Sequence, residues 1–186
     1  RLYHDMNNHN LVMWKLAEKG EYERLHKYIG KLRPLEKDRH RQWTQNLILD
    51  MILEYKLLAM EKKKILYEIK TDMIGEIALA DKELCILLGN LLDNAIEACE
   101  KLEEEKRMVK IEVRKHHSMF MLIVENSCEA HAQVRKGIFR TTKKDDRMHG
   151  YGIHNVRKTV KNRGGQFQYG SRGENFYVKI LIPLVI

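Results

Sequence analysis

The sequence predicts two structural parts: a helical hairpin, followed by an α+β two-layer sandwich of helices against a mainly antiparallel sheet. Up to residue 64, apolar residues recur at three- and four-residue steps, which is the period of an amphipathic helix. From Ile65 onward, short alternating runs typical of strands are mixed with helical runs. We therefore expect a hairpin domain over 1–62 and a sandwich domain over 63–186.

In the first part, we expect a helix over 1–32 with a break at Gly20, because glycine costs about 1 kcal/mol relative to alanine inside a helix. A turn follows around Gly30 and Pro34, and a second helix runs from about residue 41 to residue 64. Such a hairpin cannot bury its apolar stripe alone. It is therefore expected to dimerise as a four-helix bundle.

In the second part, helices and strands are expected to alternate. The expected strands are 65–70, 109–114, 120–125, 166–171 and 176–183. Asp81 is a suitable N-cap for a helix that runs to about Leu102, and Gly164 and Gly165 end a second helix that begins at Tyr151. A charged loop containing glycine connects Cys128 to that second helix.

The composition excludes some classes of protein. Of the 186 residues, 44% are hydrophobic, and no run of about 18 apolar residues would span a membrane. The three cysteines show neither a CxxC pair nor the ligand spacing of a zinc site. The formal net charge of +8 would attract ATP, nucleic acid or an anionic membrane, so charge alone selects none of these partners.

Two asparagines mark the first candidate site. Asn90 and Asn94 are four residues apart in NLLDNAIEA, so both side chains project from one face of the predicted helix. An amide oxygen can bind Mg²⁺, which takes most of its oxygen ligands from phosphates and water. Exposed polar residues of an ordinary amphipathic helix would give the same pattern.

A glycine motif strengthens the nucleotide hypothesis. Gly150 and Gly152 stand at the start of a predicted helix, where backbone N–H groups can approach a phosphate. The preceding loop is cationic and carries Lys143, Lys144 and Arg147. A glycine pair alone is weak evidence, but its combination with the asparagine helix favours a nucleotide site.

The stretches LCILLGNLLDNAIEACE and GYGIHNV resemble the N-box and G-box of the GHKL superfamily of gyrase, Hsp90, histidine kinase and MutL ATPases. The sequence also resembles peptide quorum-sensing histidine kinases of the Agr type. The resemblance implies a GHKL (Bergerat) fold that binds ATP and Mg²⁺, with Asn94 as the magnesium ligand and Asn90 near the phosphates. It places Gly150 and Gly152 at the junction between a lid and a helix, and it makes the three loop cations candidates for phosphate contacts.

One element departs from the superfamily pattern. Most members have an Asp-x-Gly-x-Gly element whose aspartate binds the adenine amino group, whereas this chain has Asn126-Ser at the matching strand end, as in the Agr-type branch. The amide oxygen of Asn126 could accept from that amino group. An ordinary turn asparagine after a strand is the alternative.

A second comparison favours transfer over hydrolysis. In the hydrolases of the superfamily, a glutamate four residues before the magnesium asparagine activates water. Here that position is Asn90, and an amide cannot act as a general base.

His4 is the candidate phosphoryl acceptor. A neutral imidazole nitrogen accepts well near pH 7, and the adjacent Asp5 can orient the ring and take its proton. Asn8 shares the helix face of His4 and could position a water that attacks phosphohistidine. An isolated helical histidine is usually a surface residue, but HDxxNH resembles the H-box of the Agr-type kinases. His9 belongs to that motif and, at a spacing of five, is interpreted as a supporting residue.

These resemblances imply a protein-histidine kinase that phosphorylates itself and then a response-regulator receiver domain, with a phosphatase activity as a further implication. The segment 56–65 is the expected hinge that lets the nucleotide domain reach the hairpin. Because the histidine lies so near the first residue, we expect the chain to be a piece of a longer protein. The family implies a membrane sensor for a peptide, with this part on the cytoplasmic side of the cell membrane.

Two alternatives remain open. One is a phosphorelay phosphotransferase with a degenerate ATP-binding domain, which ATP binding would distinguish. The more distant one is a non-enzymatic basic module that binds nucleic acid with strong salt dependence. The sequence lacks a recognisable DNA- or RNA-binding motif, so nucleic acid is not expected as a partner.

Overall fold

The computed structural model describes residues 2–32, 42–129 and 151–184, and of residues 2–6 and 151 it describes the backbone alone. The chain divides into two compact units, Arg1–His40 and Arg41–Ile186. None of the described helices combines the length and the apolar character needed to cross a membrane.

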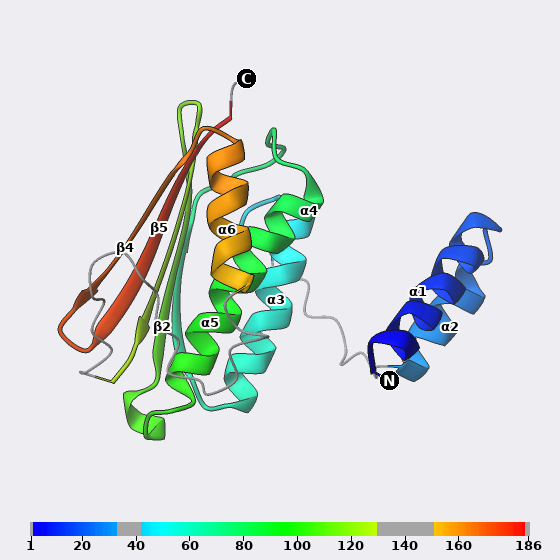
Figure 1. Ribbon diagram of the computed structural model, residues 1–186, viewed down its shortest axis with the longest axis horizontal. Helices are drawn as coiled ribbons and strands as arrows, with labels where there is room; N and C mark the ends of the chain where they lie inside the picture. Colours follow the sequence, from blue (N-terminus) through cyan, green and yellow to red (C-terminus); the bar gives the residue numbers. More distant parts are fainter. Residues whose placement is uncertain (1, 33–41, 130–150, 185–186) are drawn as a thin grey trace. The chain divides into compact units, whose positions relative to one another are not determined.

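The first unit is a pair of antiparallel helices (Figure 1). α1 (Leu2–Glu18) and α2 (Tyr22–Leu32) are joined by a tight turn in which Gly20 has a φ of 70°, a conformation that glycine adopts without strain. His9 Nδ1 lies 2.8 Å from the Tyr28 hydroxyl, so the two helices are joined by a side-chain hydrogen bond. The expected break at Gly20 is confirmed, but the chain reverses there completely.

The helix after the first unit packs differently from the prediction. α3 (Leu47–Lys62) was expected to be the second helix of the hairpin, yet it belongs to the second unit, where Leu49, Leu53 and Met60 are 0% exposed. The boundary therefore lies at 40/41, and not after residue 62. The physical reason is that an apolar helical stripe shows that a helix is buried on one side, but not what it packs against. The segment 56–65, predicted as a hinge, lies inside this unit and includes the buried Ile65.

The second unit contains a five-stranded sheet in the order β1-β2-β3-β5-β4. β1 (Leu66–Thr71) pairs in parallel with β2 (Met108–His116), and the remaining pairs are antiparallel. The other strands are β3 (Met119–Ser127), β4 (Gln166–Arg172) and β5 (Asn175–Pro183). All five predicted strands are confirmed, with their ends shifted by at most a few residues.

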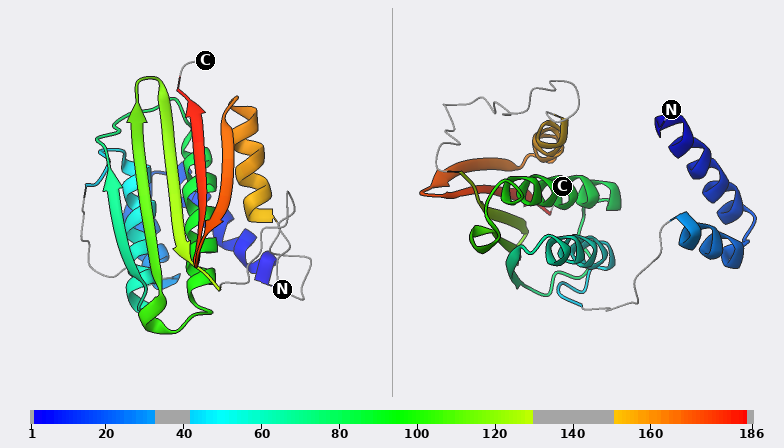
Figure 2. Two further views of the ribbon diagram at one scale, coloured as in Figure 1. Left: turned by 90° about the vertical axis from the view of Figure 1, so that its left-hand side faces the viewer. Right: turned by 90° about the horizontal axis from the view of Figure 1, so that it is seen from below.

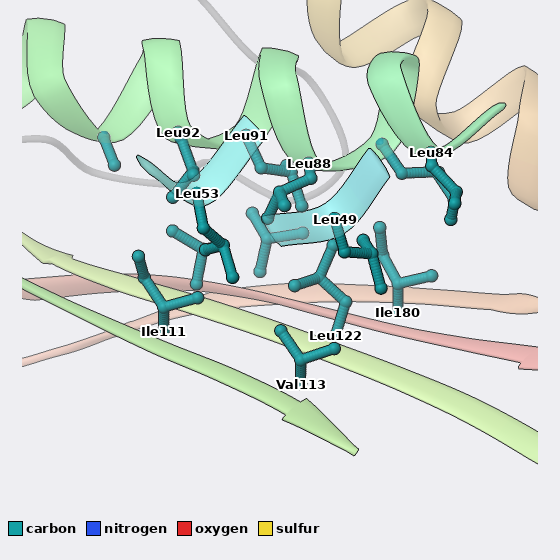
Figure 3. Packing of buried hydrophobic residues seen from close by; sticks show 14 of the residues in the cluster. Leu49, Leu53, Leu84, Leu88, Leu91, Leu92, Ile111, Val113, Leu122 and Ile180 are labelled. Atoms are coloured by element: carbon teal, nitrogen blue, oxygen red, sulfur yellow. The ribbon is translucent and has the colours of Figure 1, made fainter. Parts of the chain in front are cut away.

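Three helices cover one face of this sheet, and α5 (Asn90–Cys99) lies between α3 and α6 (Tyr151–Asn162) (Figures 1 and 2). Alternate residues of each strand face these helices; on β3 they are Phe120, Leu122 and Val124, all buried. Leucines of α3 and α5 meet strand residues such as Ile111 and Ile180 in the core (Figure 3). This two-layer arrangement confirms the predicted α+β sandwich.

The helix over 81–99 has an interruption that the sequence did not predict. α4 (Asp81–Leu84) is followed by a π-helical turn, Cys85–Gly89, which leads into α5. The N-cap position is Ala80 rather than the predicted Asp81, and the Glu83 carboxylate accepts from the Ala80 N–H at 2.9 Å. A short 3₁₀ helix, Glu104–Lys106, precedes β2.

A bidentate ion pair ties the end of α6 to α4. Arg163 donates to both carboxylate oxygens of Glu83, with an Nε–Oε1 distance of 2.7 Å, and the two side chains are 24% and 21% exposed. We expect Arg163→Ala to lower the free energy of unfolding at pH 7 by about 1–3 kcal/mol, because a partly buried carboxylate loses its charged partner and keeps only the hydrogen bond from the Ala80 N–H.

This contribution depends on pH. The hydrogen bond from Arg163 holds the pKa of Glu83 below its ordinary value of 4.5, so the stabilisation is present above that value and is lost as the pH falls through the lower folded pKa. Urea unfolding at pH 7 and pH 3 should therefore show a large difference between wild type and variant at pH 7 and a small one at pH 3. Lys161→Ala, in the last turn of α6 two residues before Arg163, is the matched control. Equal losses at both pH values would contradict this account.

Candidate functional site

The asparagine helix is placed as predicted. Asn90 and Asn94 lie one turn apart on α5, and both are half-buried, while Leu91, Leu92 and Ala95 are buried in the core. The apolar side of α5 therefore fixes the rotation of the helix, and the two amides share a face that the core does not occupy.

Asn94 has an unusual amide. Its Nδ2 atom is buried and has no hydrogen-bond partner among the described residues. Leaving such a group unpaired costs about 1–3 kcal/mol, so a buried orphan in a folded protein indicates a ligand or another partner that completes the site. This side chain fits a site where phosphate oxygens and a metal ion arrive together, because its amide offers both a donor and a neutral oxygen.

Asn90 lies where the asparagine helix α5 meets the glycine motif at the start of α6. Its Nδ2 donates to the Ile86 carbonyl at 2.7 Å. On the other side, a Cβ added to Gly152 would lie only 2.9 Å from Asn90 Oδ1. The first turn of α6 therefore approaches α5 closely because position 152 has no side chain.

Asn126 lies at the end of β3. It is 5% exposed and continues the row of residues that faces the helices, and its Nδ2 donates to the Ser127 carbonyl at 2.9 Å. The end of α5 is near this strand end, since Cys99 Sγ lies 3.8 Å from the Ser127 carbonyl oxygen. Asn126 is therefore a buried polar residue with its amide orientation fixed by the backbone, rather than an exposed turn residue.

Several predicted site residues cannot be placed here. Lys143, Lys144, Arg147 and Gly150 lie outside the described residues. His4 and Asp5 belong to α1 and are described by their backbone alone, whereas Asn8 is exposed on the same helix. The structure therefore brings together Asn90 and Gly152, with Asn94 on the same helix, and assigns His4, Asp5 and Asn8 to the other unit.

A metal ion at this site would depend on few protein ligands. Across the parts of the chain that the structure describes, no group of three or more His, Cys, Asp and Glu side chains could hold a metal ion. Mg²⁺ commonly takes one or two protein oxygens and completes its shell with phosphates and water, so a single amide such as Asn94 matches that pattern.

The π-helical turn and the surface beside it were missed by the sequence interpretation. An open groove of about 450 Å³ lies between α3 and this turn, with Ile48 and Ile52 on one side and Cys85 and Gly89 on the other. Lys56 and Asp93 also line the groove, and Lys56 Nζ donates to Asp93 Oδ1 at 2.5 Å. In the sequence, the small side chains at positions 85 and 89 could have indicated a groove on this helix. The spacing of apolar residues could not have indicated the π-turn.

Comparison with known proteins defines the class. A sequence model described as the GHKL domain matches residues 79–183, which is more than half of the chain. The chain therefore belongs to the GHKL family, as its N-box and G-box predicted. No curated protein sequence gives a significant match.

Solved structures of histidine kinases have the same fold. The catalytic domain of histidine kinase ThkA is similar with a TM-score of 0.61 and 20% identity, over 76% of this chain and 95% of that one. Acinetobacter baumannii histidine kinase AdeS is similar over 98% of both chains, with a TM-score of 0.56 and 14% identity. The mycobacterial sensor histidine kinase MprB gives a TM-score of 0.52 and 16% identity, over 73% of this chain and 93% of that one.

Proposed function

We propose that this chain is an ATP-dependent protein-histidine kinase that phosphorylates His4 and passes the phosphoryl group to a response-regulator receiver domain. The observation that carries the proposal is the orphaned amide of Asn94, which lies on the N-box helix of a GHKL domain. The fold of histidine-kinase catalytic domains supports the same reaction class.

The nucleotide would be held by residues of the second unit. Asn94 supplies an oxygen to Mg²⁺, which neutralises charge on the phosphates when it is bound. Asn90 and Gly152 lie at the phosphate side, together with Gly150 and three loop cations, Lys143, Lys144 and Arg147. The oxygen of Asn126 accepts from the adenine amino group, since its nitrogen is already bonded to the Ser127 carbonyl.

The chemistry is transfer rather than hydrolysis. An imidazole nitrogen of His4 attacks the γ-phosphorus of ATP, the bond to the β–γ bridging oxygen breaks, and ADP leaves. Asp5 orients the ring and takes up its proton. Asn90 stands where a hydrolase would need a carboxylate, so no general base for water is offered at that position. Asn8, which is exposed and lies four residues after His4, would position water only for the phosphatase reaction.

A homodimer fits the surface of the first unit. Leu11 and Trp14 on α1 are 57% and 56% exposed, and Tyr22 at the start of α2 is 69% exposed. Large apolar side chains at this exposure are stabilised when a second hairpin covers them in a four-helix bundle. The Agr-type role in quorum sensing and a position on the cytoplasmic side of a membrane rest on the sequence resemblance alone.

The test is incubation of the chain with Mg²⁺ and γ-labelled ATP. We expect an acid-labile, alkali-stable label on the protein, as for phosphohistidine, in excess of free phosphate. Release of phosphate without protein label would make the domain a hydrolase. Failure to bind Mg·ATP and to take up label would instead support the phosphotransferase with a degenerate domain.

A further inference from the structure

The two asparagines of α5 differ in how their amides are used. Asn94 Nδ2 is buried without a partner among the described residues, whereas Asn90 Nδ2 donates to the Ile86 carbonyl at 2.7 Å. The same carbonyl also accepts the backbone N–H of Asn90, so one residue directs two donors at it. Identical side chains one turn apart therefore have different roles.

The orientation of the Asn90 amide follows from its surroundings. The atom facing the Ile86 carbonyl must be the nitrogen, because an amide oxygen in that place would meet another oxygen without a hydrogen between them. The amide oxygen is then turned toward Gly152, 2.9 Å from the place of an added Cβ. The amide is thus held between α5 and the first turn of α6.

Asn90 also lies where the helix changes from π-helical to α-helical geometry. The π-helical turn Cys85–Gly89 ends directly before it. A π-turn holds one more residue than an α-turn, so it rotates every residue that follows relative to the preceding helix. A donor that bonds back to Ile86, four residues earlier, fixes the helix across this turn.

We propose that Asn90 is a positioning residue of the nucleotide site rather than a direct ligand. Its amide nitrogen fixes the π-turn, and through that turn it sets where Asn94 lies relative to Gly152 in the first turn of α6. The inference rests on the proposed nucleotide site and specifies how that site is held in shape.

Two variants of the whole chain test this role. In Asn90→Ser, the hydroxyl can donate to the carbonyl four residues earlier, so the bond to Ile86 is retained. In Asn90→Asp, the ionised side chain accepts only and faces that carbonyl without a donor. A metal ligand would behave in the opposite way, because a carboxylate binds Mg²⁺ at least as well as an amide.

We expect Asn90→Ser to keep the unfolding temperature without nucleotide and the Mg·ATP affinity within about threefold of wild type. Asn90→Asp should lower the unfolding temperature by roughly 3 °C and weaken Mg·ATP binding about tenfold, a change of one hydrogen bond's size. Differential scanning calorimetry and isothermal titration measure the two quantities.

Full affinity in Asn90→Asp, or a large loss of affinity in Asn90→Ser without a change in unfolding temperature, would overturn the proposal. If the wild-type chain does not bind Mg·ATP, the proposed function fails. In that case the unfolding temperatures without nucleotide alone test the positioning role of Asn90. Equal values for the two variants would show that the hydrogen bond from its amide to Ile86 has no such role.

Discussion

Replacing Asn94 by alanine is expected to weaken Mg·ATP binding about 100-fold while leaving the free energy of unfolding of the nucleotide-free chain unchanged or higher. The affinity falls because a metal-directed oxygen and a charge-assisted donor are both lost, at about 1.5–3 kcal/mol. Stability is preserved because the variant removes a buried donor without a partner among the described residues and places alanine, the best helix former, inside α5.

Asp93→Ala is the matched control for this variant. Asp93 precedes Asn94 on α5, is 59% exposed and pairs with Lys56 on α3. The carboxylate of this pair is exposed although the Lys56 side chain is only 12% exposed, so its loss should cost about 1 kcal/mol of stability, with the affinity for Mg·ATP close to wild type. Isothermal titration measures the Mg·ATP affinity of the two variants, and chemical unfolding measures their stability. Wild-type affinity in Asn94→Ala, or a stability loss above about 2 kcal/mol, would show that its amide serves another structural purpose.

The second large effect is expected for Gly152→Ala. A Cβ at this position would lie 2.9 Å from Asn90 Oδ1, which cannot turn away without giving up the hydrogen bond to the Ile86 carbonyl. Either that bond breaks or α6 shifts, and overpacking of this kind costs about 1–3 kcal/mol. We expect a loss of unfolding free energy in this range and Mg·ATP binding at least about tenfold weaker.

Gly89→Ala provides the contrast at the same junction. An added Cβ at Gly89 meets nothing within 4 Å, and its φ of −58° suits alanine. That variant should be as stable as wild type or up to about 1 kcal/mol more stable. In an Asn90→Ala background, Gly152→Ala should cost clearly less than in wild type, because the opposing amide is gone. Chemical unfolding of the four chains measures this coupling, and strictly additive losses would contradict the contact.

Much of the second unit could be predicted because local pattern and tertiary contact agree there. The alternation in 120–125 gave β3, and its helix-facing residues Phe120, Leu122 and Val124 are buried. The periodic run after Asp81 and the glycines after Arg163 gave the helices that carry Asn90, Asn94 and Gly152. Here one face of each element is buried, so its side chains could have only one orientation.

Other features depended on information that periodicity does not contain. α3 has the apolar stripe expected of a hairpin helix, but Leu49 and Leu53 pack in the second unit, and nothing local distinguishes the two possible partners. The π-turn before Asn90 could not be predicted, because an apolar run such as CILLG fits a π-turn and an α-turn equally. The contrast between a bonded Asn90 and an orphaned Asn94 arises from three-dimensional contacts and could not be read from their spacing.

The central claim is that the phosphoryl group of ATP is transferred to His4, and peptide mapping of the labelled chain tests it most directly. Wild type, His4→Gln and His9→Gln would be labelled side by side with Mg²⁺ and γ-labelled ATP. His9 is the matched control, since it belongs to the same motif but bonds to Tyr28 at 2.8 Å. We expect that the label maps to His4, disappears in His4→Gln and remains in His9→Gln. A label that persists in His4→Gln, or that maps to another residue, would contradict it.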